Sequence, residues 1–288
     1  MSKILIIGEN SFLGRNLHSF LKEKKFQTKI ISHKNITEST IKNSSIVINF
    51  AINPIFYEAK YRNSINFDLS FIDFIKNSDT RYIFLSSRKV YSSFMDIPLK
   101  ETDPTYPSTN YGKNKLISEQ IVLNKVQEKA LVLRLSNVVG FEPIVGRKTI
   151  MAYIINSIVE KRAISVNTTY NTRKDFLPLP LFCEVLTHFI SNWQSGIFNV
   201  GSGIGYKLGE VIDLITGNLN FHVNVTYKKV EQDSFILDVN KMKGMTKKQI
   251  TKTQIDSYFN LIGRNLSYHL AQQMINEQSK KPDNIQLR

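Results

Sequence analysis

"ILIIGENSFLGRN", residues 4–16, joins a short apolar run to two glycines, Gly8 and Gly14, that stand six residues apart. The apolar run predicts a buried strand, and a glycine directly after it lets the backbone turn tightly because no Cβ is in the way. The second glycine lets the following helix lie close to the sheet, and N–H groups between the two can face a bound phosphate. Asn10 takes the place of the middle glycine of the strict G-x-G-x-x-G pattern. For this stretch taken alone, a strand-to-helix turn that binds no nucleotide is therefore the alternative.

The first 140 residues alternate short β-rich runs with longer amphipathic runs, which predicts an α/β fold with a Rossmann-like doubly wound parallel sheet. The predicted strands are residues 3–7, 28–32, 46–50, 81–85 and 130–135. The predicted helices are residues 12–24, 64–76 and 110–128. Asn110 is the expected N-cap of the third helix. After about residue 160 the pattern is mixed and loop-rich around Pro178 and Pro180, before a strand at 197–200 and a helix at 208–216.

Composition narrows the class of protein. The chain has 288 residues, 42% of them hydrophobic, and a formal net charge of +14. Its lysines are spread in short groups, so we expect a solvated basic surface and no nucleic-acid partner. No apolar run approaches the roughly 20 residues that span a bilayer, and no signal peptide precedes the first strand, so we expect no membrane partner and a cytoplasmic protein. Cys183 is the single cysteine and is expected to be a buried thiol, and no metal site is predicted.

The end of the second predicted strand indicates which dinucleotide would bind. Ser32, His33 and Lys34 follow that strand, where an NAD-binding chain usually carries an acidic residue for the ribose hydroxyls. No carboxylate occurs between Glu23 and Glu38, so nothing in this stretch repels a 2′-phosphate, which the three polar side chains can bind and neutralise. We therefore expect NADP(H) to be preferred and NAD(H) to be possible; an ordinary polar turn is the alternative.

A tyrosine and a lysine four residues apart, in YGKNK at 111–115, lie on one face of the third predicted helix. The nearby ammonium of Lys115 favours a phenolate, so we expect the pKa of Tyr111 to be lowered toward neutrality and its hydroxyl to exchange a proton with a substrate oxygen. Ser86 and Ser87 end the fourth predicted strand, at the sheet edge where doubly wound folds bind ligands. A hydroxyl there can polarise the same substrate carbonyl.

These and further motifs follow the order found in the extended short-chain dehydrogenase/reductase superfamily, which the chain resembles from about residue 3 to 245. The further motifs are NFA at 49–51, LRLSNVVG at 133–140, RKDFLPLP at 173–180 and FNVGSG at 198–203. That superfamily contains sugar-nucleotide epimerases, dehydratases and ketoreductases. Ser11 takes the middle position of its G-x-x-G-x-x-G turn, where a small residue keeps the backbone near the pyrophosphate and adds a hydroxyl.

The resemblance implies three groups of site residues. The implied catalytic residues are Ser87, Tyr111 and Lys115. The implied cofactor-binding residues are Gly8, Ser11, Phe12, Leu13, Gly14, Ser32, His33, Lys34, Phe50, Ala51, Asn66, Tyr111 and Lys115. The implied substrate-binding residues are Ser87, Arg88, Asn137, Arg173 and Lys174. Asn137 and either Arg173 or Lys174 would contact the diphosphate of the substrate.

The resemblance also implies an activity. Ser87 is followed by Arg88 and Lys89, where dehydratases of the superfamily carry Asp-Glu, so dehydration is not expected. We expect an NADPH-dependent reductase of a 4-keto sugar nucleotide, of use in surface polysaccharide synthesis, with Tyr111 as proton donor. A nucleotide-sugar 4-epimerase is the alternative, and a catalytically inactive cofactor-binding regulator is a further one.

We expect residues 1–160 to form an NADP-binding Rossmann domain that is completed by about residues 195–216. Residues 161–280 would form a smaller, mainly substrate-binding lobe, and residues 281–288 a flexible tail. The predicted helices at 64–76 and 110–128 could pair across a two-fold axis, so a homodimer is possible.

Overall fold

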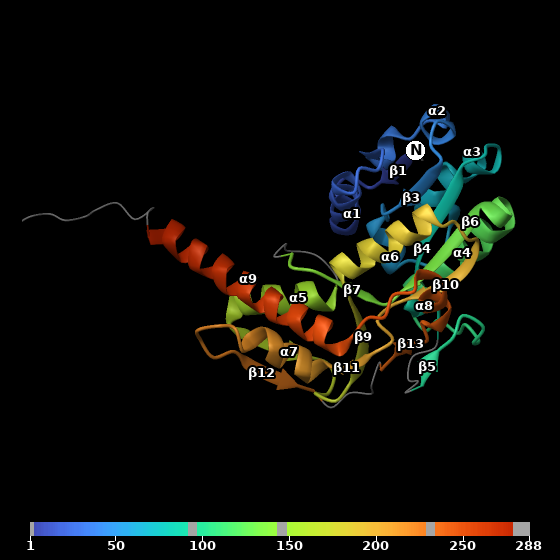
Figure 1. The fold of residues 1–288 in the computed structure, drawn as a ribbon. Coiled ribbons are helices and arrows are strands. Elements are labelled where there is room, and N and C mark those ends of the chain that lie inside the picture. The colour runs from blue at the N-terminus through green and yellow to red at the C-terminus, as the bar shows by residue number, and fades with distance from the viewer. Residues whose placement is uncertain (1–2, 92–96, 143–148, 229–233, 279–288) are drawn as a thin grey trace, which may run out of the picture. The chain divides into compact units, whose positions relative to one another are not determined.

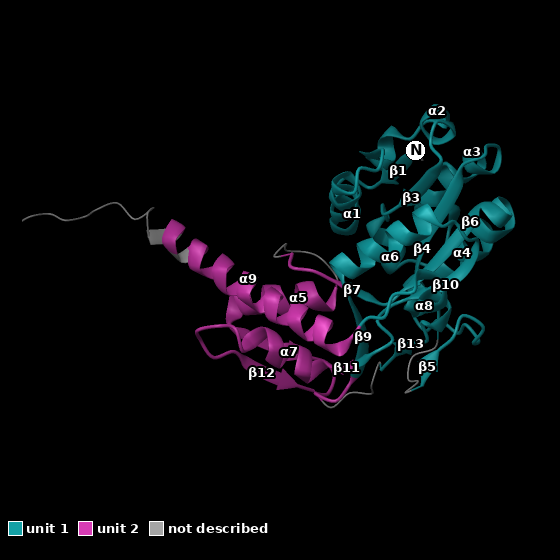
Figure 2. Ribbon diagram, in the orientation of Figure 1, with its two compact units in different colours: residues 1–138, 173–205, 233–250 teal, residues 139–172, 206–232, 251–288 magenta. Residues whose placement is uncertain are grey.

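The computed structural model describes residues 3–91, 97–142, 149–228 and 234–278, so the predicted tail at 281–288 lies outside the described residues. The chain divides into two compact units (Figure 2). Unit 1 comprises residues 1–138, 173–205 and 233–250, and unit 2 comprises residues 139–172, 206–232 and 251–288. The first boundary falls at residue 138 and not near 160, and the segments that return to unit 1 are residues 173–205 and 233–250, where about 195–216 was expected.

Unit 1 is built on a six-stranded parallel sheet, so the predicted Rossmann-like architecture is confirmed (Figure 1). The strands are β1 (Ile4–Ile7), β2 (Thr28–Ile31), β3 (Ile46–Asn49), β4 (Arg81–Ser87), β6 (Ala130–Leu135) and β10 (Gly196–Val200). Their order is β10-β6-β4-β3-β1-β2, and Ile4 of β1 pairs with Thr28 on one side and Ile46 on the other. The chain therefore changes direction across the sheet at β1, and this switch point is where such sheets bind ligands.

Helices cover the sheet of unit 1. They are α1 (Phe12–Glu23), α2 (Glu38–Lys42), α3 (Ile72–Lys76), α4 (Asn110–Val126), α6 (Leu179–Ser191) and α8 (Asn240–Thr246). One buried cluster joins alternate strand residues such as Leu5 and Val47 to Ile41 of α2, Ile72 of α3 and Val122 of α4. Helices α1 and α6 pack against each other. The buried thiol of Cys183 in α6 confirms the expectation for that residue.

The predicted helix at 64–76 is wrong. The segment forms two short 3-10 turns, Asn63–Ile65 and Phe67–Ser70, before the five-residue α3. Asn66 breaks the helix because its side chain accepts the N–H of Asp68, and the carboxylate of Asp68 turns inward. There it accepts hydrogen bonds from the Asn49 amide, at 2.7 Å, and from the Tyr82 hydroxyl.

Two other local predictions also need correction. Helix α4 starts at Asn110, but Thr109 is its N-cap, accepting the N–H of Gly112 at 3.1 Å. The stretch around the prolines is no loop, because Pro178 stands just before α6 and Pro180 lies in its first turn. A backbone N–H in the first turn of a helix has no partner within the helix, so Pro180 removes no hydrogen bond there.

The remaining elements of unit 1 are short. They are β5 (Pro98–Leu99), β9 (Arg173–Pro178) and β13 (Ile236–Leu237). Two short strands run across the unit limits, β7 (Asn137–Val139) and β11 (Gly205–Lys207). Strand β13 pairs in parallel with β5, and α8 packs near β10. These contacts draw residues 233–250 back to unit 1.

Unit 2 is helical with a two-stranded parallel sheet. Its elements are α5 (Ile150–Lys161), β8 (Ala163–Val166), α7 (Leu208–Thr216), β12 (Asn224–Tyr227) and α9 (Lys252–Gln278). Strand β12 pairs with β8, and α7 packs along α9. Of the helices in the described part of the chain, none combines the length and the apolar character needed to cross a membrane.

Candidate active site

The glycine turn joins three parts of unit 1 at the carboxyl edge of the sheet. Gly8 follows β1 with φ of +112°, and a Cβ on it would lie 2.9 Å from the backbone nitrogen of Ala51. The contact at Gly14 is less severe, because a Cβ there would lie 3.2 Å from the carbonyl oxygen of Gly8 and 3.4 Å from Phe50. The Gly8 N–H donates to the carbonyl of Ile31 at 2.8 Å. Gly8 therefore has a backbone that other residues rarely adopt, and Gly14 lets α1 begin close to the sheet; binding of a pyrophosphate at the start of α1 stays a prediction.

Ser11 has a structural task in this turn. It is the N-cap of α1, and its hydroxyl oxygen accepts the N–H of Gly14 at 3.3 Å. Phe12 and Leu13, the first residues of the helix, are half-buried beside it. The Ser11 hydroxyl acts as the acceptor in this bond, so its proton can be donated to a ligand. The contact with a pyrophosphate stays a prediction.

The second-strand end forms a short, ordered turn. Ser32 accepts the N–H of Lys34 at 3.4 Å and so caps the 3-10 turn His33–Asn35, while the Lys34 side chain is exposed. The His33 ring stacks on Phe67, with centroids 4.2 Å apart and planes 16° apart. Phe67 comes from the segment after β3, and no local sequence signal identified it.

Asn66 ties its own segment to α4. Its amide nitrogen donates to the Tyr61 hydroxyl at 3.1 Å and to the Ser118 hydroxyl at 3.0 Å. Its oxygen accepts the N–H of Asp68 at 3.0 Å. Protein groups already engage both ends of this amide, so the side chain has a structural function: it attaches its own segment to α4. A direct contact with a cofactor stays a prediction.

The structure brings the serine, tyrosine and lysine together at the end of β4. Tyr111, in the first turn of α4, is hydrogen-bonded to the side chain of Ser87. The Lys115 ammonium donates to the Leu85 carbonyl of β4 at 2.8 Å. Gly112 makes this approach possible, since a Cβ there would lie 2.1 Å from the carbonyl oxygen of Lys89.

The predicted lowering of the pKa of Tyr111 is wrong. Burial raises the pKa of this phenol above its usual range, Tyr57 raises it further, and the hydrogen bond with Ser87 offsets part of the rise. The Lys115 ammonium donates one hydrogen bond to the Leu85 carbonyl, and its charge does not outweigh the burial of the phenol. Burial lowers the pKa of Lys115, and the charges of Asp68 and Glu119 oppose that shift. Tyr111 is therefore a proton donor in this state.

Ser86, next to Ser87, belongs to a buried polar network behind the site. Its hydroxyl donates to the carboxylate of Glu119 in α4, and that carboxylate pairs with the Arg134 guanidinium of β6 at 2.8 Å. The guanidinium also donates to the Tyr91 hydroxyl at 2.9 Å, and burial raises the pKa of Tyr91 to about 12. Sequence reasoning missed this ion pair, although Glu119 stands one helical turn after the lysine.

Two of the predicted substrate-binding cations converge on one ring. The buried Arg88 guanidinium carbon lies 3.5 Å from the ring centroid of Phe235, and the ammonium of the buried Lys174 lies 5.8 Å from it. Arg173, in contrast, is exposed. The Asn137 amide donates to the carbonyl of Asp175 at 3.1 Å. Of the two alternatives for the diphosphate, the structure groups Lys174 with Arg88.

Asp175 has a different function from its charged neighbours in β9. Its carboxylate accepts the N–H groups of Ser202, Gly203 and Leu237 and the Ser202 hydroxyl, at 2.8 to 3.3 Å. Burial raises the pKa of this carboxyl, and these hydrogen bonds oppose the shift. The aspartate therefore fixes the turn after β10.

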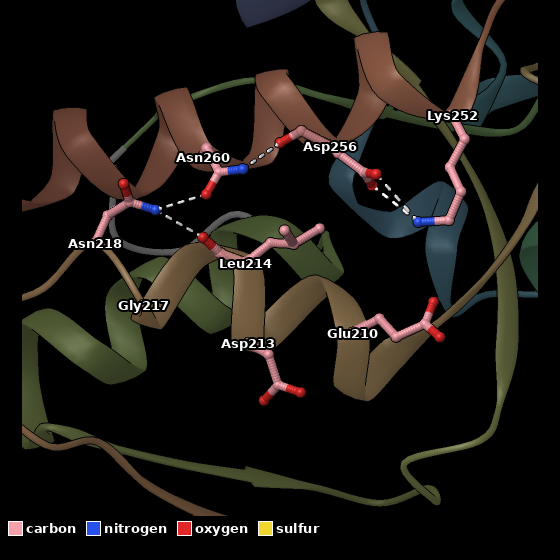
Figure 3. A pocket seen from close by; sticks show the side chains of 8 residues that line it. All are labelled: Glu210, Asp213, Leu214, Gly217, Asn218, Lys252, Asp256 and Asn260. Carbon is pink, nitrogen blue, oxygen red and sulfur yellow. Dashed lines mark hydrogen bonds and ion pairs between the residues drawn. The ribbon is translucent and has the colours of Figure 1, made fainter.

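Unit 2 has a hollow of its own, between α7 and α9 (Figure 3). It measures about 440 Å³ and contains none of the predicted site residues. The Lys252 ammonium pairs with Asp256 at 3.1 Å on its rim, and the Asn218 amide donates to Asn260 at 2.9 Å. No cluster of histidine, cysteine, aspartate and glutamate suited to a metal ion occurs among the described residues.

The sheet, the glycine turn and the grouped hydroxyl, phenol and ammonium define the class of protein, an NAD(P)-dependent enzyme with a Rossmann-like fold. The chain belongs to the NAD dependent epimerase/dehydratase family, whose sequence model matches residues 4–201. The match covers β1 through β10, so the predicted superfamily is confirmed.

Two curated relatives align with part of the chain. The dTDP-4-dehydro-6-deoxyglucose reductase of Escherichia coli is 23% identical over 182 residues, 59% of this chain and 57% of that protein. The UDP-glucose 4-epimerase of Halalkalibacterium halodurans is 27% identical over 207 residues, 60% of this chain and 61% of that protein. The chain thus aligns with less than two thirds of the length of either relative.

Solved structures show the same fold over nearly the whole chain. A UDP-N-acetylglucosamine 4-epimerase from Methanobrevibacter ruminantium has a TM-score of 0.77 at 15% identity, covering 94% of this chain and 99% of that one. RMD from Pseudomonas aeruginosa, complexed with NADPH, has a TM-score of 0.75 at 17% identity, covering 93% of this chain and 100% of that one.

Proposed function

We propose that the protein is an NADPH-dependent reductase that acts on the ketone of a 4-keto sugar nucleotide. The observation that carries the proposal is the grouping of Ser87, Tyr111 and Lys115 at the end of β4, where Lys115 donates to the Leu85 carbonyl at 2.8 Å and burial raises the pKa of the phenol. Reduction of a ketone needs a proton donor at the oxygen, and a protonated tyrosine beside a serine hydroxyl meets that need.

The residues present fit a dinucleotide. The Gly8 turn has the positive φ and the close backbone approach that such a site uses, and α1 starts directly behind it. When bound, NADPH supplies the hydride. Tyr111 then gives its proton to the ketone oxygen, and Ser87 holds that oxygen in place. Lys115 would supply a positive charge for the ribose hydroxyls and for the developing alkoxide.

The remaining assignments support the same proposal. Ser32, His33 and Lys34 form an ordered turn with an exposed ammonium, which suits the 2′-phosphate of NADP(H) better than the bare ribose of NAD(H). Arg88 and Lys174 would bind the anionic part of a nucleotide-diphosphate sugar. We also propose a cytoplasmic location and a homodimer.

A nucleotide-sugar 4-epimerase is the second candidate function, favoured by the alignment with the Halalkalibacterium halodurans enzyme. Epimerisation uses the tyrosine first as a base and then as an acid, whereas reduction uses it as an acid alone. An inactive regulator would bind the cofactor at the same site and show no turnover.

The deciding experiment measures the nicotinamide absorbance band of the purified chain, followed by NADPH consumption with 4-keto sugars of four nucleotides. An empty protein that consumes NADPH stoichiometrically with sugar reduction supports the reductase. Retained cofactor with sugar interconversion and no net NADPH loss would establish the epimerase, and cofactor binding without turnover would leave the regulator. Thermal shift with dTDP, UDP, GDP and CDP identifies the nucleotide, because saturation at about 100 times the Kd adds about 2.7 kcal/mol of stability.

A further inference from the structure

An aromatic turn after β3 lies directly against the start of α4. It is the 3-10 turn Pro54–Tyr57, which Asn53 caps by accepting the N–H of Ile55 with its side-chain oxygen at 3.1 Å. Helix α4 holds the end of the turn through Asn110, which donates to the carbonyl of Glu58 at 2.5 Å. Two segments more than fifty residues apart in sequence are thereby fixed to each other.

Asn114 provides the stronger part of this attachment. It is almost completely buried, and its amide nitrogen donates to the carbonyls of Phe56 and Ala59, each at 2.9 Å. Its side-chain oxygen is buried without a hydrogen-bond partner among the described residues. Burying an amide oxygen without a partner costs stability. The favourable contribution of Asn114 is therefore its two hydrogen bonds to the turn. It stands between the candidate catalytic residues Tyr111 and Lys115 on the same helix.

The turn places two rings on the catalytic tyrosine. Tyr57 stacks on Tyr111, with centroids 4.9 Å apart and planes 15° apart. Phe56 meets Tyr111 by its edge, at 6.4 Å and 77°, and the Lys115 ammonium lies 5.7 Å from the Phe56 ring. Tyr111 thus contacts one stacked ring and one nearly perpendicular ring, beside Ser87.

We propose that Tyr57 is a positioning residue for Tyr111, its stacked ring holding the phenol so that the hydroxyl stays on Ser87 throughout turnover. The inference rests on the proposed function. Proton transfer requires the donor within hydrogen-bond reach of the ketone oxygen, and small displacements of a reacting group cost large factors in rate. The Tyr57 side chain is suited to this task and is not needed for the core, because 37% of its surface is exposed.

The test compares Tyr57→Leu, which removes the aromatic face, with Tyr57→Phe, which keeps it. Stacked aromatic pairs contribute enough to shift a conformational equilibrium by about two- to tenfold, so Tyr57→Leu should lower kcat by about that factor. The KM for the sugar and the Kd for NADPH should stay within about twofold, since only the donor is displaced. Tyr57→Phe should retain the wild-type kcat. Ile55→Ala, an exposed change on the same turn, is the matched control.

A second measurement needs no substrate. In NMR spectra of ring-labelled tyrosine, the Tyr111 signal is the one that disappears in Tyr111→Phe. It should shift in Tyr57→Leu because the ring current of the stacked neighbour is lost, and stay near its wild-type position in Tyr57→Phe.

Three results would overturn the inference. They are a wild-type kcat in Tyr57→Leu, an equal loss of kcat in Tyr57→Phe, and a rise in sugar KM in place of the fall in kcat, which would make Tyr57 a substrate contact. Full turnover in Tyr111→Phe would instead end the proposed function itself. An inactive Tyr111→Phe beside an unaffected Tyr57→Leu would end only the positioning role.

Discussion

Gly112→Ala should damage catalysis more than its size suggests. The added Cβ would lie 2.1 Å from the carbonyl oxygen of Lys89, 3.0 Å from the Lys89 carbonyl carbon and 2.9 Å from the Cβ of Pro107. An ordinary contact begins at 3.4 Å, so α4 must retreat by about 1.3 Å from the turn that follows β4. Backbone atoms lie on both sides of the contact, and no side-chain rotation relieves it.

The retreat would carry Tyr111 away from Ser87. Misplacement by about 1 Å typically costs about 10²-fold in rate, so kcat for ketone reduction should fall by about that factor. Overpacking at the same contact should lower the free energy of unfolding by about 1–3 kcal/mol. NADPH turnover, far-UV circular dichroism and urea unfolding measure the three quantities. The reasoning is refuted if Gly112→Ala folds and turns over substrate at the wild-type rate.

Gly244→Ala is the matched control. Gly244 lies inside the short helix α8, and a Cβ there would meet nothing within 4 Å. Alanine is the better helix former, so this substitution should leave kcat unchanged and stabilise the protein by about 0.4–1 kcal/mol.

Three further predictions concern charge. In pH–rate profiles, kcat should stay level as the pH rises to 10, because the raised pKa of Tyr111 keeps the donor protonated. The affinity for NADPH should weaken first, because burial lowers the pKa of Lys115. A fall in kcat at constant NADPH affinity would contradict this expectation. Lys34→Asp should reverse the order of NADPH and NADH affinities in fluorescence titrations by repelling the 2′-phosphate, and equal Kd values in the unchanged protein would refute the assignment. Glu119→Gln should lower the free energy of unfolding by about 3–5 kcal/mol in urea, because the Arg134 charge is left buried without its partner, and a change below about 1 kcal/mol would argue against a buried pair.

Two controls separate these effects from generic charge changes. Lys76→Asp, an exposed change in the last turn of α3 before β4 begins, makes the same charge change away from the carboxyl edge and should leave the order of cofactor affinities unaltered. Glu184→Gln removes one partner of an ion pair with Lys248 in which both side chains are substantially exposed. That pair should contribute no more than about 1 kcal/mol.

The sheet was predictable because each inner strand is a continuous apolar run followed by a polar turn. The predicted strand at 130–135 and the helix at 208–216 match the structure residue for residue. The helix at 64–76 failed because apolar spacing could not show that Asp68 would point inward to Asn49 and Tyr82. The Asp68 side chain accepts hydrogen bonds from buried groups of β3 and β4, and this tertiary requirement overrides helix propensity.

The site was predictable in its members and not in their environment. Motif order identified Ser87, Tyr111 and Lys115, and the structure does bring them together at the end of β4. The pKa of the tyrosine is raised first by burial and then by Tyr57, which lies 54 positions earlier in the chain and belongs to no motif. Stacking between segments so distant has no local signature in the sequence.

The interrupted course of unit 1 has a consequence for how the protein is made. Strand β6 ends at Leu135 and its neighbour β10 begins at Gly196, so 60 residues lie between the two strands. A ribosome delivers the first five strands of the sheet well before the sixth, and during that interval the apolar edge of β6 has no partner. An unpaired parallel edge is an aggregation hazard, and pairing between distant segments is slow. Expression yield should therefore respond to chaperone supply and to temperature, and a chain cut after residue 138 should be insoluble although it contains the glycine turn and the catalytic tyrosine.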